Sequence, residues 1–288
     1  MKKGRAAAPP HPQAPPESEV AGAFGRGAEY YQDNAGVQKE AAQRLVAFLN
    51  LRAGALPPGP ILEVGCGTGF VSEGLCSIFP DRTVHLTDLS EGMVRYCAES
   101  VASRRSTHVS AFTADAEFWR GGDEYALIVA AFVAQWFKDP AAGLRRLARS
   151  LRPGGILLAS VPTAASFPEW RRACDEAREP FTGAPLPEAS ELAAGLTSAH
   201  LDVEWTEASF TETFRSPLDF LIHLKRMGAA AGSSREPLST GSMRRLLRAW
   251  ERRTDGPARI TYQVLFLLAA RPLSGPGEDA LPWTDPRP

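Results

Sequence analysis

The amino-acid sequence predicts a Rossmann-like α/β fold, in which a doubly wound and mostly parallel sheet carries an antiparallel edge strand and helical cap and lid insertions. Between residues 37 and 161, short apolar or β-branched runs alternate with longer stretches of helical periodicity. Such alternation is typical of βαβ units whose sheet is buried on both faces. The first apolar run leads into a glycine-rich turn, and residues 203–270 read as strand, helix, helix and strand, which predicts the antiparallel edge.

The elements of the alternating part follow from periodicity and from helix-breaking residues. The expected strands cover residues 60–64, 83–87, 109–113, 125–131 and 156–161. The expected helices cover residues 37–49, the stretch from the glycine turn to about Phe79, 91–102 and 140–151. We expect Pro153-Gly154-Gly155 to stop the last of these helices, because proline and glycine cannot continue it.

Residues 167–199 interrupt the alternation with a helical pattern that prolines break, and they indicate an inserted cap. The remaining strands and helices are expected at 203–214, 216–227, 242–253 and 259–270. Both chain ends are rich in proline and poor in aliphatic residues, which predicts disordered tails at 1–19 and 272–288. Residues 20–271 are then expected to form a single domain.

Composition and charge exclude several classes of function. The chain has 32 Lys and Arg against 33 Asp and Glu, which excludes the overall basic field that holds proteins on nucleic acid or anionic lipid. The apolar run 264–270 is far shorter than the roughly 20 residues of a membrane span. Prolines also interrupt the N-terminal stretch where a secretory signal needs apolar residues. We therefore expect a cytoplasmic protein that binds neither nucleic acid nor membrane.

The cysteine pattern points to no metal site. The chain has four cysteines, at positions 66, 76, 97 and 174. They form no C-x-x-C pair and have no histidine at ligand spacing, so neither a zinc site nor a disulfide framework is expected.

A glycine-rich turn carries the strongest chemical signal. The segment Gly65-Cys66-Gly67-Thr68-Gly69 follows the first expected strand and precedes a helix. Glycine allows a tight turn and a close approach to a ligand, and the free N–H groups of a helix start attract polar or anionic groups. The G-x-G-x-G spacing differs from the G-x-G-x-x-G of dinucleotide sites, and a P-loop is excluded because no G-K-[ST] follows.

Two aspartates follow the next two strands. Asp88 closes the second strand, where a carboxylate can accept hydrogen bonds from both hydroxyls of a ribose, and Asp115 follows the third strand, within reach of an adenine amino group. Together with the glycine turn they predict an adenosine ligand across the carboxyl ends of a parallel sheet. The alternative is a purely structural glycine turn with two exposed acids.

These features resemble the class I S-adenosylmethionine-dependent methyltransferases, in which motif I, the ribose acid and the adenine acid match Glu63 to Gly69, Asp88 and Asp115. The resemblance implies S-adenosyl-L-methionine as cofactor and S-adenosyl-L-homocysteine as product. The residues that it implies for cofactor binding are Glu63, Gly65, Cys66, Gly67, Gly69, Asp88, Leu89, Met93, Asp115, Ala116 and Ala131. No metal is implied.

Further segments narrow the resemblance to the malonyl-acyl-carrier-protein O-methyltransferases of biotin synthesis, over about residues 21–271. The matching segments are Ala23 to Tyr31 with Ala35 and Gln38, Gln135-Trp136, Pro168-Glu169, Arg215-Ser216-Pro217, Leu224-Lys225, Gly228-Ala229 and Thr261-Tyr262. The resemblance implies methyl transfer to the free carboxyl group of a malonyl thioester on acyl carrier protein, beneath an N-terminal lid at residues 20–50. A carboxylate is already ionised at pH 7, so no general base is required, and orientation and exclusion of water carry the catalysis.

The family resemblance also implies catalytic and substrate-binding residues. The catalytic candidates are Tyr30, Tyr31, Gln135 and Trp136, and the substrate-binding candidates are Phe24, His223, Lys225 and Arg226. For the tyrosines and Trp136 the alternative is plain packing. His223 and Lys225 lie two residues apart on an expected helix, so we expect only one of them to face the substrate.

A carrier protein is acidic, so a basic patch is expected near the substrate site, while the enzyme itself is expected to be a monomer. The candidate clusters are Arg171-Arg172, Lys225-Arg226, Arg244-Arg245 with Arg248, Arg252-Arg253, and Arg145-Arg146 with Arg149.

The chain departs from the family at the fourth expected strand. Ala126 stands where an Asp is usual, and Ala130 and Ala131 stand where a Ser-Asn pair is usual. These departures leave two alternatives open: a methyltransferase for another small acid, phenol or amine, and a protein that binds the cofactor or a partner without catalysis.

Overall fold

The computed structural model describes residues 28–102, 108–122, 124–229, 237–254 and 256–273. Seven strands form one sheet in the order β3-β2-β1-β4-β5-β7-β6. Neighbouring strands from β3 to β5 are parallel, whereas β7 is antiparallel to both β5 and β6, as the sequence predicts for this edge. The strands are β1 (Ile61–Val64), β2 (Val84–Asp88), β3 (Val109–Thr113), β4 (Tyr125–Ala131), β5 (Leu151–Pro162), β6 (Asp202–Phe214) and β7 (Ala258–Ala270).

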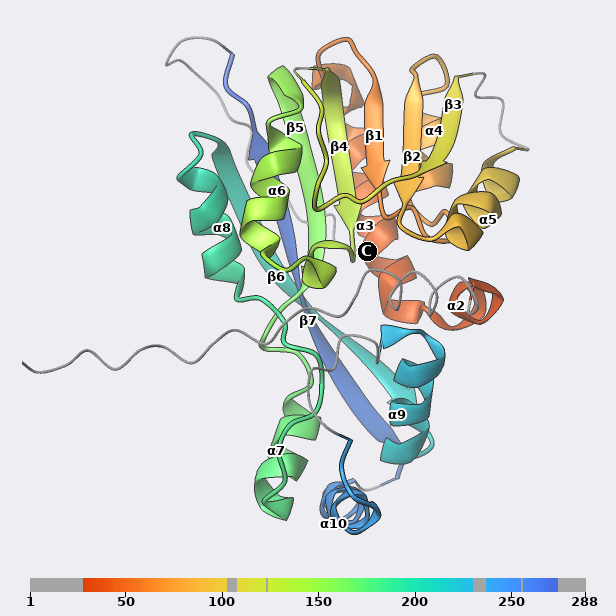
Figure 1. The fold of residues 1–288 in the computed structure, drawn as a ribbon, viewed down its shortest axis with the longest axis vertical. Helices are drawn as coiled ribbons and strands as arrows, with labels where there is room; N and C mark the ends of the chain where they lie inside the picture. The colour runs from red at the N-terminus through yellow and green to blue at the C-terminus, as the bar shows by residue number, and fades with distance from the viewer. Residues whose placement is uncertain (1–27, 103–107, 123, 230–236, 255, 274–288) are drawn as a thin grey trace, which may run out of the picture.

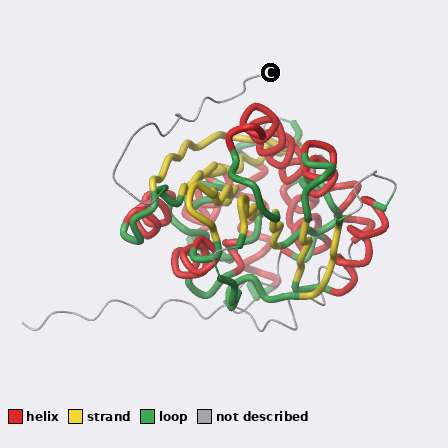
Figure 2. Tube along the Cα trace, turned by 90° about the horizontal axis from the view of Figure 1, so that it is seen from above, coloured by secondary structure: helices red, strands yellow, loops and turns green. Residues whose placement is uncertain are grey.

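Helices cover both faces of the sheet (Figures 1 and 2). The α-helices are α2 (Ala28–Asn34), α3 (Gly36–Arg52), α4 (Ser72–Ile78), α5 (Glu91–Val101), α6 (Pro140–Ala148), α7 (Pro168–Ala177), α8 (Ala189–Thr197), α9 (Pro217–Arg226) and α10 (Thr240–Glu251). Side chains of α3, α4 and α5 share one apolar core with Ile61 of β1, while those of α6 and α8 share a second core with Leu62 and Val64. The strand therefore alternates its side chains between two helical layers, as a buried parallel strand must. None of the helices described is long and apolar enough to cross a bilayer.

The sequence places most elements within a few residues of their observed bounds, and the expected ranges of the third and fourth strands are confirmed to the residue. The expected end of the helix at 140–151 is wrong. That helix ends at Ala148, and Pro153-Gly154-Gly155 lies inside β5. The register between β4 and β5 shifts between Tyr125 and Leu127, and such an irregularity accommodates a proline and two glycines that a regular ladder would reject.

The segment expected as a cap, 167–199, divides into two parts with different neighbours. Helix α8 packs on α6 and β6, within the layer that covers the sheet. Helix α7 packs instead on α10. Figure 1 shows α7, α9 and α10 grouped beyond the carboxyl ends of the parallel strands, around the far halves of β6 and β7.

Aromatic side chains hold this second group of helices together. Phe220 of α9 is fully buried and lies within 6.0 Å, between ring centroids, of Trp170, Phe167 and Trp250. These rings come from α7, the residue before it, and α10. One side chain thus joins all three helices, and aromatic rings at such distances contribute beyond their buried area.

We expect Phe220→Ala to lower the free energy of unfolding by about 3–5 kcal/mol, because it leaves a cavity among these rings. Urea denaturation followed by tryptophan fluorescence measures the change. Leu51→Ala is the control, since Leu51 is 70% exposed and its loss should change stability by less than about 0.5 kcal/mol. Equal stability of the two variants would show that the aromatic cluster is not what holds α9.

Candidate functional site

The three glycines of the turn after β1 have different surroundings. Gly65, Gly67 and Gly69 have φ values of +65°, +54° and +102°, which L side chains rarely adopt. A Cβ atom on Gly65 would lie 2.1 Å from Val133 Cγ2, and one on Gly69 would lie 2.6 Å from Ser100 Oγ. A Cβ atom on Gly67 would meet nothing closer than Tyr31 Cε1, at 3.9 Å, and Gly67 lines a crevice. Packing therefore requires Gly65 and Gly69, while Gly67 leaves space for a ligand.

Asp88, at the end of β2, ties this turn to the neighbouring strand. Its Oδ2 accepts a hydrogen bond from Gly67 N at 3.0 Å, and its Oδ1 accepts one from Ser90 N at 2.8 Å. Burial raises the pKa of the Asp88 carboxyl group, and the backbone N–H bonds from Ser90, Gly67 and Leu89 oppose that shift. Each carboxylate oxygen keeps a second lone pair, so Asp88 can still accept a hydrogen bond from a ligand hydroxyl.

The crevice beside this turn gathers most of the predicted cofactor residues. Eight of the eleven line it, namely Gly65, Gly67, Asp88, Leu89, Met93, Asp115, Ala116 and Ala131. Asp115 sits in a tight turn of its own, because its Oδ1 accepts a hydrogen bond from Glu117 N at 2.8 Å. The crevice has a volume of about 120 Å³, below the roughly 300–1,000 Å³ of typical ligand pockets. A complete nucleoside ligand therefore needs neighbouring side chains to move aside.

Glu63, Cys66 and Gly69, the other three predicted cofactor residues, do not line the crevice. Glu63 is buried on the α4 side of β1, where its Oε2 accepts a hydrogen bond from Ser72 Oγ at 2.7 Å. Burial, and next the nearby Cys97, raise the pKa of Glu63 well above its ordinary value. Its position indicates that it fixes the start of α4 beneath the turn.

A larger cavity of about 600 Å³ lies on the other side of the site, between the sheet and the group of α7, α9 and α10. Most side chains that line it are apolar. They include Phe132, Pro162, Phe167, Trp170, Leu221, Leu224, Met227, Leu238, Met243 and Tyr262. Among the described residues that line this cavity, Lys225 is the one charged side chain. The cavity can therefore take a mainly neutral ligand that carries an anionic group.

Three aromatic residues border both cavities, namely Tyr31, Phe132 and Trp136. Burial, and next the charge of Asp88, raise the pKa of Tyr31, so its hydroxyl group remains a hydrogen-bond donor at neutral pH. Phe132 has a φ of +54°, a strained conformation for a bulky residue. Such strain is concentrated at functional sites, and here it directs a ring between the two cavities. These residues mark where ligands from the two cavities would meet.

Gln135 lines the larger cavity, as the resemblance implies, but its amide group is partly engaged. Its Nε2 donates a hydrogen bond to Phe132 O at 2.8 Å, while its buried Oε1 has no partner among the described residues. The group left over is thus an acceptor. It suits an N–H or O–H of a ligand, whereas a carboxylate would be repelled.

His223 and Lys225 both line the larger cavity, so the expectation that only one of them faces the substrate is wrong. The short helix α9 ends one residue later, at Arg226, and the cavity wraps around its last turn. His223 is buried, which lowers its pKa and keeps the imidazole neutral. Its Nδ1 lies 3.3 Å from the hydroxyl group of Tyr30, which joins α9 to α2.

The other predicted site residues lie outside both cavities or outside the described part of the chain. Tyr30 and Arg226 line neither cavity, and the guanidinium group of Arg226 lies 5.7 Å from the ring centre of Tyr30. Phe24 lies outside the described residues.

Sequence reasoning missed several residues that line the larger cavity. Phe132 directly follows β4, and the rule that ligands meet strand ends could have found it. Trp170 and Met243 could not have been found in this way, because they lie within the helices α7 and α10.

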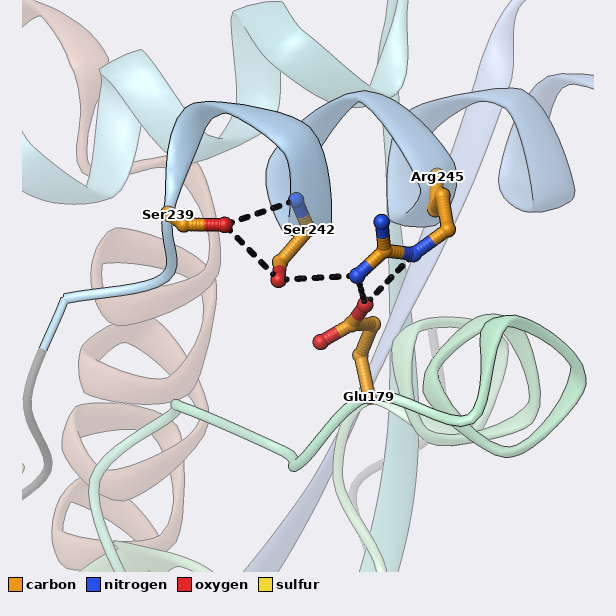
Figure 3. Close-up of polar contacts among 4 residues, drawn as sticks. All are labelled: Glu179, Ser239, Ser242 and Arg245. Atoms are coloured by element: carbon orange, nitrogen blue, oxygen red, sulfur yellow. Dashed lines mark hydrogen bonds and ion pairs between the residues drawn. The ribbon is translucent and has the colours of Figure 1, made fainter.

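A polar link joins two walls of this cavity (Figure 3). Arg245 Nε of α10 donates to Glu179 Oε1 at 2.8 Å, and Arg245 Nη2 donates to Ser242 Oγ at 3.1 Å. Ser239 Oγ accepts from Ser242 N at 3.1 Å, which caps the start of α10. The loop after Glu179 and the start of α10 both line the cavity, so the link holds them side by side.

Comparisons with known proteins match this geometry. A family model described as a methyltransferase domain matches residues 61–155. A malonyl-acyl-carrier-protein O-methyltransferase of Porphyromonas gingivalis is 32% identical over 244 residues, which cover 83% of this chain and 90% of the relative. The chain belongs to this family. A similar enzyme of Magnetococcus marinus is 31% identical, with 84% of this chain and 88% of the relative covered.

The family also includes a longer protein. The biotin biosynthesis bifunctional protein BioCD of Bordetella avium is 33% identical over 256 residues, which cover 87% of this chain and 52% of the relative. The chain thus spans about half of that protein. Solved structures share the fold: the YcgJ protein of Bacillus subtilis superposes with a TM-score of 0.59 at 14% identity, covering 80% of this chain and 99% of that one.

Some segments that resemble the family have structural tasks here. Glu169 accepts hydrogen bonds from Thr261 N at 3.1 Å and from Thr261 Oγ1 at 2.7 Å, which ties α7 to β7. Ser216 caps α9 by accepting a hydrogen bond from Asp219 N at 3.1 Å. Glu169, Thr261 and Ser216 hold the walls of the larger cavity without lining it themselves, whereas Tyr262, next to Thr261, does line it.

We expect Gly67→Asn to weaken binding of S-adenosylhomocysteine by about tenfold or more, equal to about 1.4 kcal/mol, because its side chain enters the space next to Tyr31. Asparagine tolerates a positive φ better than other side chains, so the variant should fold. Isothermal titration measures the affinity. Gly256→Asn is the control, since Gly256 also has a positive φ, of +94°, and open space around it. Equal affinity of both variants would remove Gly67 from the ligand site.

Burial of Glu63 predicts a pH dependence of stability. Its pKa in the folded protein lies above the ordinary value of 4.5, so the native state binds more protons than the unfolded state between the two values. Stability therefore falls as the pH rises through that window, by up to about 1.4 kcal/mol per pH unit. Glu63→Gln keeps an acceptor for Ser72 and should flatten the fall. Urea denaturation at several pH values measures this, and an unchanged slope would contradict the assignment.

Proposed function

We propose that the chain transfers a methyl group from S-adenosyl-L-methionine to the free carboxylate of a malonyl thioester on acyl carrier protein, an early step of biotin synthesis. One observation carries the proposal. A crevice of nucleoside-binding type meets an apolar cavity at Tyr31, Phe132 and Trp136, and Lys225 is the one cation among the described residues that line this cavity. A methyl donor and an anionic acceptor held in these two cavities would face each other across these side chains.

The residues of the crevice fit this donor. Gly67 lacks a side chain where the ligand would approach, and Asp88 and Asp115 offer carboxylates that can accept hydrogen bonds from ribose hydroxyls and an adenine amino group. When bound, S-adenosylmethionine supplies an electrophilic methyl group on a sulfonium. The protein's contribution is to hold and orient that group, and the Asp88 bond to Gly67 N keeps the turn in place for it.

The substrate cavity fits an acid that is already ionised. A malonyl carboxylate needs no general base at pH 7. Lys225 offers it a cation, and Tyr31 offers a neutral hydroxyl donor. The surrounding aromatic and aliphatic walls exclude water, which strengthens these contacts and leaves the carboxylate oxygen free to attack. Orientation and desolvation then carry the catalysis.

The proposal includes the setting in which the enzyme acts. We propose a monomer in the cytoplasm that uses acyl carrier protein as its partner and binds neither nucleic acid nor membrane. The nearly balanced charge of the chain, with 32 basic against 33 acidic side chains, supports the part of this proposal that excludes nucleic acid and membrane.

Mass spectrometry of acyl carrier protein after incubation with the enzyme and S-adenosylmethionine tests the proposal. We expect malonyl carrier protein to gain one methyl group. Acetyl carrier protein is the matched control, because it has the same thioester and no free carboxylate, and it should remain unchanged. Methylation of neither thioester would overturn the proposal.

A second reaction on a different acid is a specific alternative, because β4 ends in two apolar residues, Ala130, which is fully buried, and Ala131, which lines the crevice. Free malonate, succinyl carrier protein and simple phenols are assayed in parallel. Faster turnover of any of these than of malonyl carrier protein would favour the alternative. Binding of S-adenosylhomocysteine without turnover of any acceptor would favour a protein that has lost catalysis.

A further inference from the structure

The outer face of α9 exposes two large aliphatic side chains on successive turns. Leu218 is 45% exposed and Ile222 is 40% exposed, and they are four residues apart, which places them on one face of the helix. Pro217, Phe220 and His223 of the same helix are buried against the fold. Helix α9 is therefore apolar on both its inner and its outer face.

Basic residues flank this pair at both ends. Arg226 follows Ile222 by four residues and lies on the same face of α9, while Arg215 lies just before the helix, next to its N-cap Ser216. We call Leu218, Ile222 and Arg226 the α9 stripe. The other exposed large apolar side chains in the described part of the chain are dispersed over separate elements; they are Leu51, Phe112, Phe118, Trp205 and Leu273. Single exposed apolar residues are ordinary, whereas an aligned pair between cations indicates a contact surface.

The stripe leads to the substrate cavity. Lys225, next to Arg226, lines that cavity, and so do Leu221 and Leu224 on the inner side of the same helix. Arg226 lies over the ring of Tyr30 in α2, which stands beside α9 in Figure 1. A partner seated on the stripe would be one helix width from the cavity.

Ion pairing distinguishes α9 from three of the arginines at and after α10. Arg245 pairs with Glu179, and Arg252 and Arg253 both pair with Glu176, so these cations of α10 are neutralised within the fold. Lys225 and Arg226 are exposed, and no carboxylate among the described residues pairs with them. Arg215 pairs with Asp219, at 3.1 Å between Nε and Oδ2, so it is neutralised in the same way. Lys225 and Arg226 are therefore the cations of this region that stay unpaired within the described residues.

We propose that the α9 stripe, with Lys225 beside it, docks the acidic carrier protein. This proposal rests on the proposed function. An acidic helix with an aliphatic side chain among its carboxylates would complement the stripe in both charge and apolar contact. Docking there would deliver the thioester arm into the cavity that Lys225 lines. Two aliphatic side chains offer too little apolar area to hold the protein on a lipid surface.

The test compares two acceptors that share the malonyl thioester. Malonyl carrier protein presents the docking partner, whereas malonyl-pantetheine presents the acyl group on an uncharged arm alone. We expect Ile222→Glu and Leu218→Glu to raise KM for malonyl carrier protein about tenfold or more, since each replaces an apolar contact with a repelling charge. In both variants, KM for malonyl-pantetheine should equal that of the wild type. Increasing salt should raise KM of the wild type for the carrier protein only.

Arg149→Glu and Leu51→Glu are the matched controls. Arg149 is exposed after α6, and Leu51 is exposed near the end of α3, before β1, at the edge of the sheet opposite the site. Both add negative charge away from α9 and should leave both KM values unchanged. Circular dichroism confirms that all variants are folded.

The outcomes separate the two proposals. An unchanged KM for carrier protein in folded Ile222→Glu, or an equal loss on both acceptors, would overturn the docking surface and leave the proposed function intact. Gel filtration showing a wild-type dimer that Ile222→Glu dissociates would instead assign the stripe to a second copy of this chain. Failure of the wild type to methylate either acceptor would overturn the proposed function itself.

Discussion

The hydrogen bond from Gly67 N to Asp88 Oδ2 fixes the geometry on which the rest of the site depends. It joins the turn after β1 to the end of the neighbouring strand β2, and Gly67 makes it at a positive φ of +54°. The turn then leaves the crevice open beside Asp115, at the end of the next strand. Parallel strands that end at one edge of a sheet bring such loops together, so a few local contacts assemble a nucleoside site from distant parts of the sequence.

The sheet and the crevice follow closely from sequence, because both rest on local patterns. Alternating apolar runs fix the strands, and the strand-end rule brings Gly67, Asp88 and Asp115 together, as the structure confirms. For Glu63, the motif alone does not predict which way the side chain faces. A carboxyl group in motif I has the same sequence pattern whether it faces the ligand or, as here, holds Ser72 beneath the turn. Only the alternation of side chains along β1 decides between the two.

The substrate side was less accessible to sequence reasoning. Its walls come from α7, α9 and α10 and from the loops between them, and no local periodicity reports which helices pack together. His223 and Lys225 illustrate the difficulty. Helical spacing places them on different faces, yet both line the cavity because α9 ends there and the cavity surrounds its last turn. Likewise, the sequence does not show that Arg245 of α10 pairs with Glu179, or that Arg252 and Arg253 after it pair with Glu176.

The length of β6 and β7 has a consequence for how the enzyme moves. Each has 13 residues, about 40 Å of extended chain, and they pair along their whole length from the far edge of the sheet to the helices around the substrate cavity. This two-stranded ribbon is shared by two halves of the molecule, namely the sheet with its covering helices and the group of α7, α9 and α10. Bending one half against the other would strain this ladder of backbone hydrogen bonds, so we expect access to the interior to come from displacement of the helices and loops packed around the ribbon.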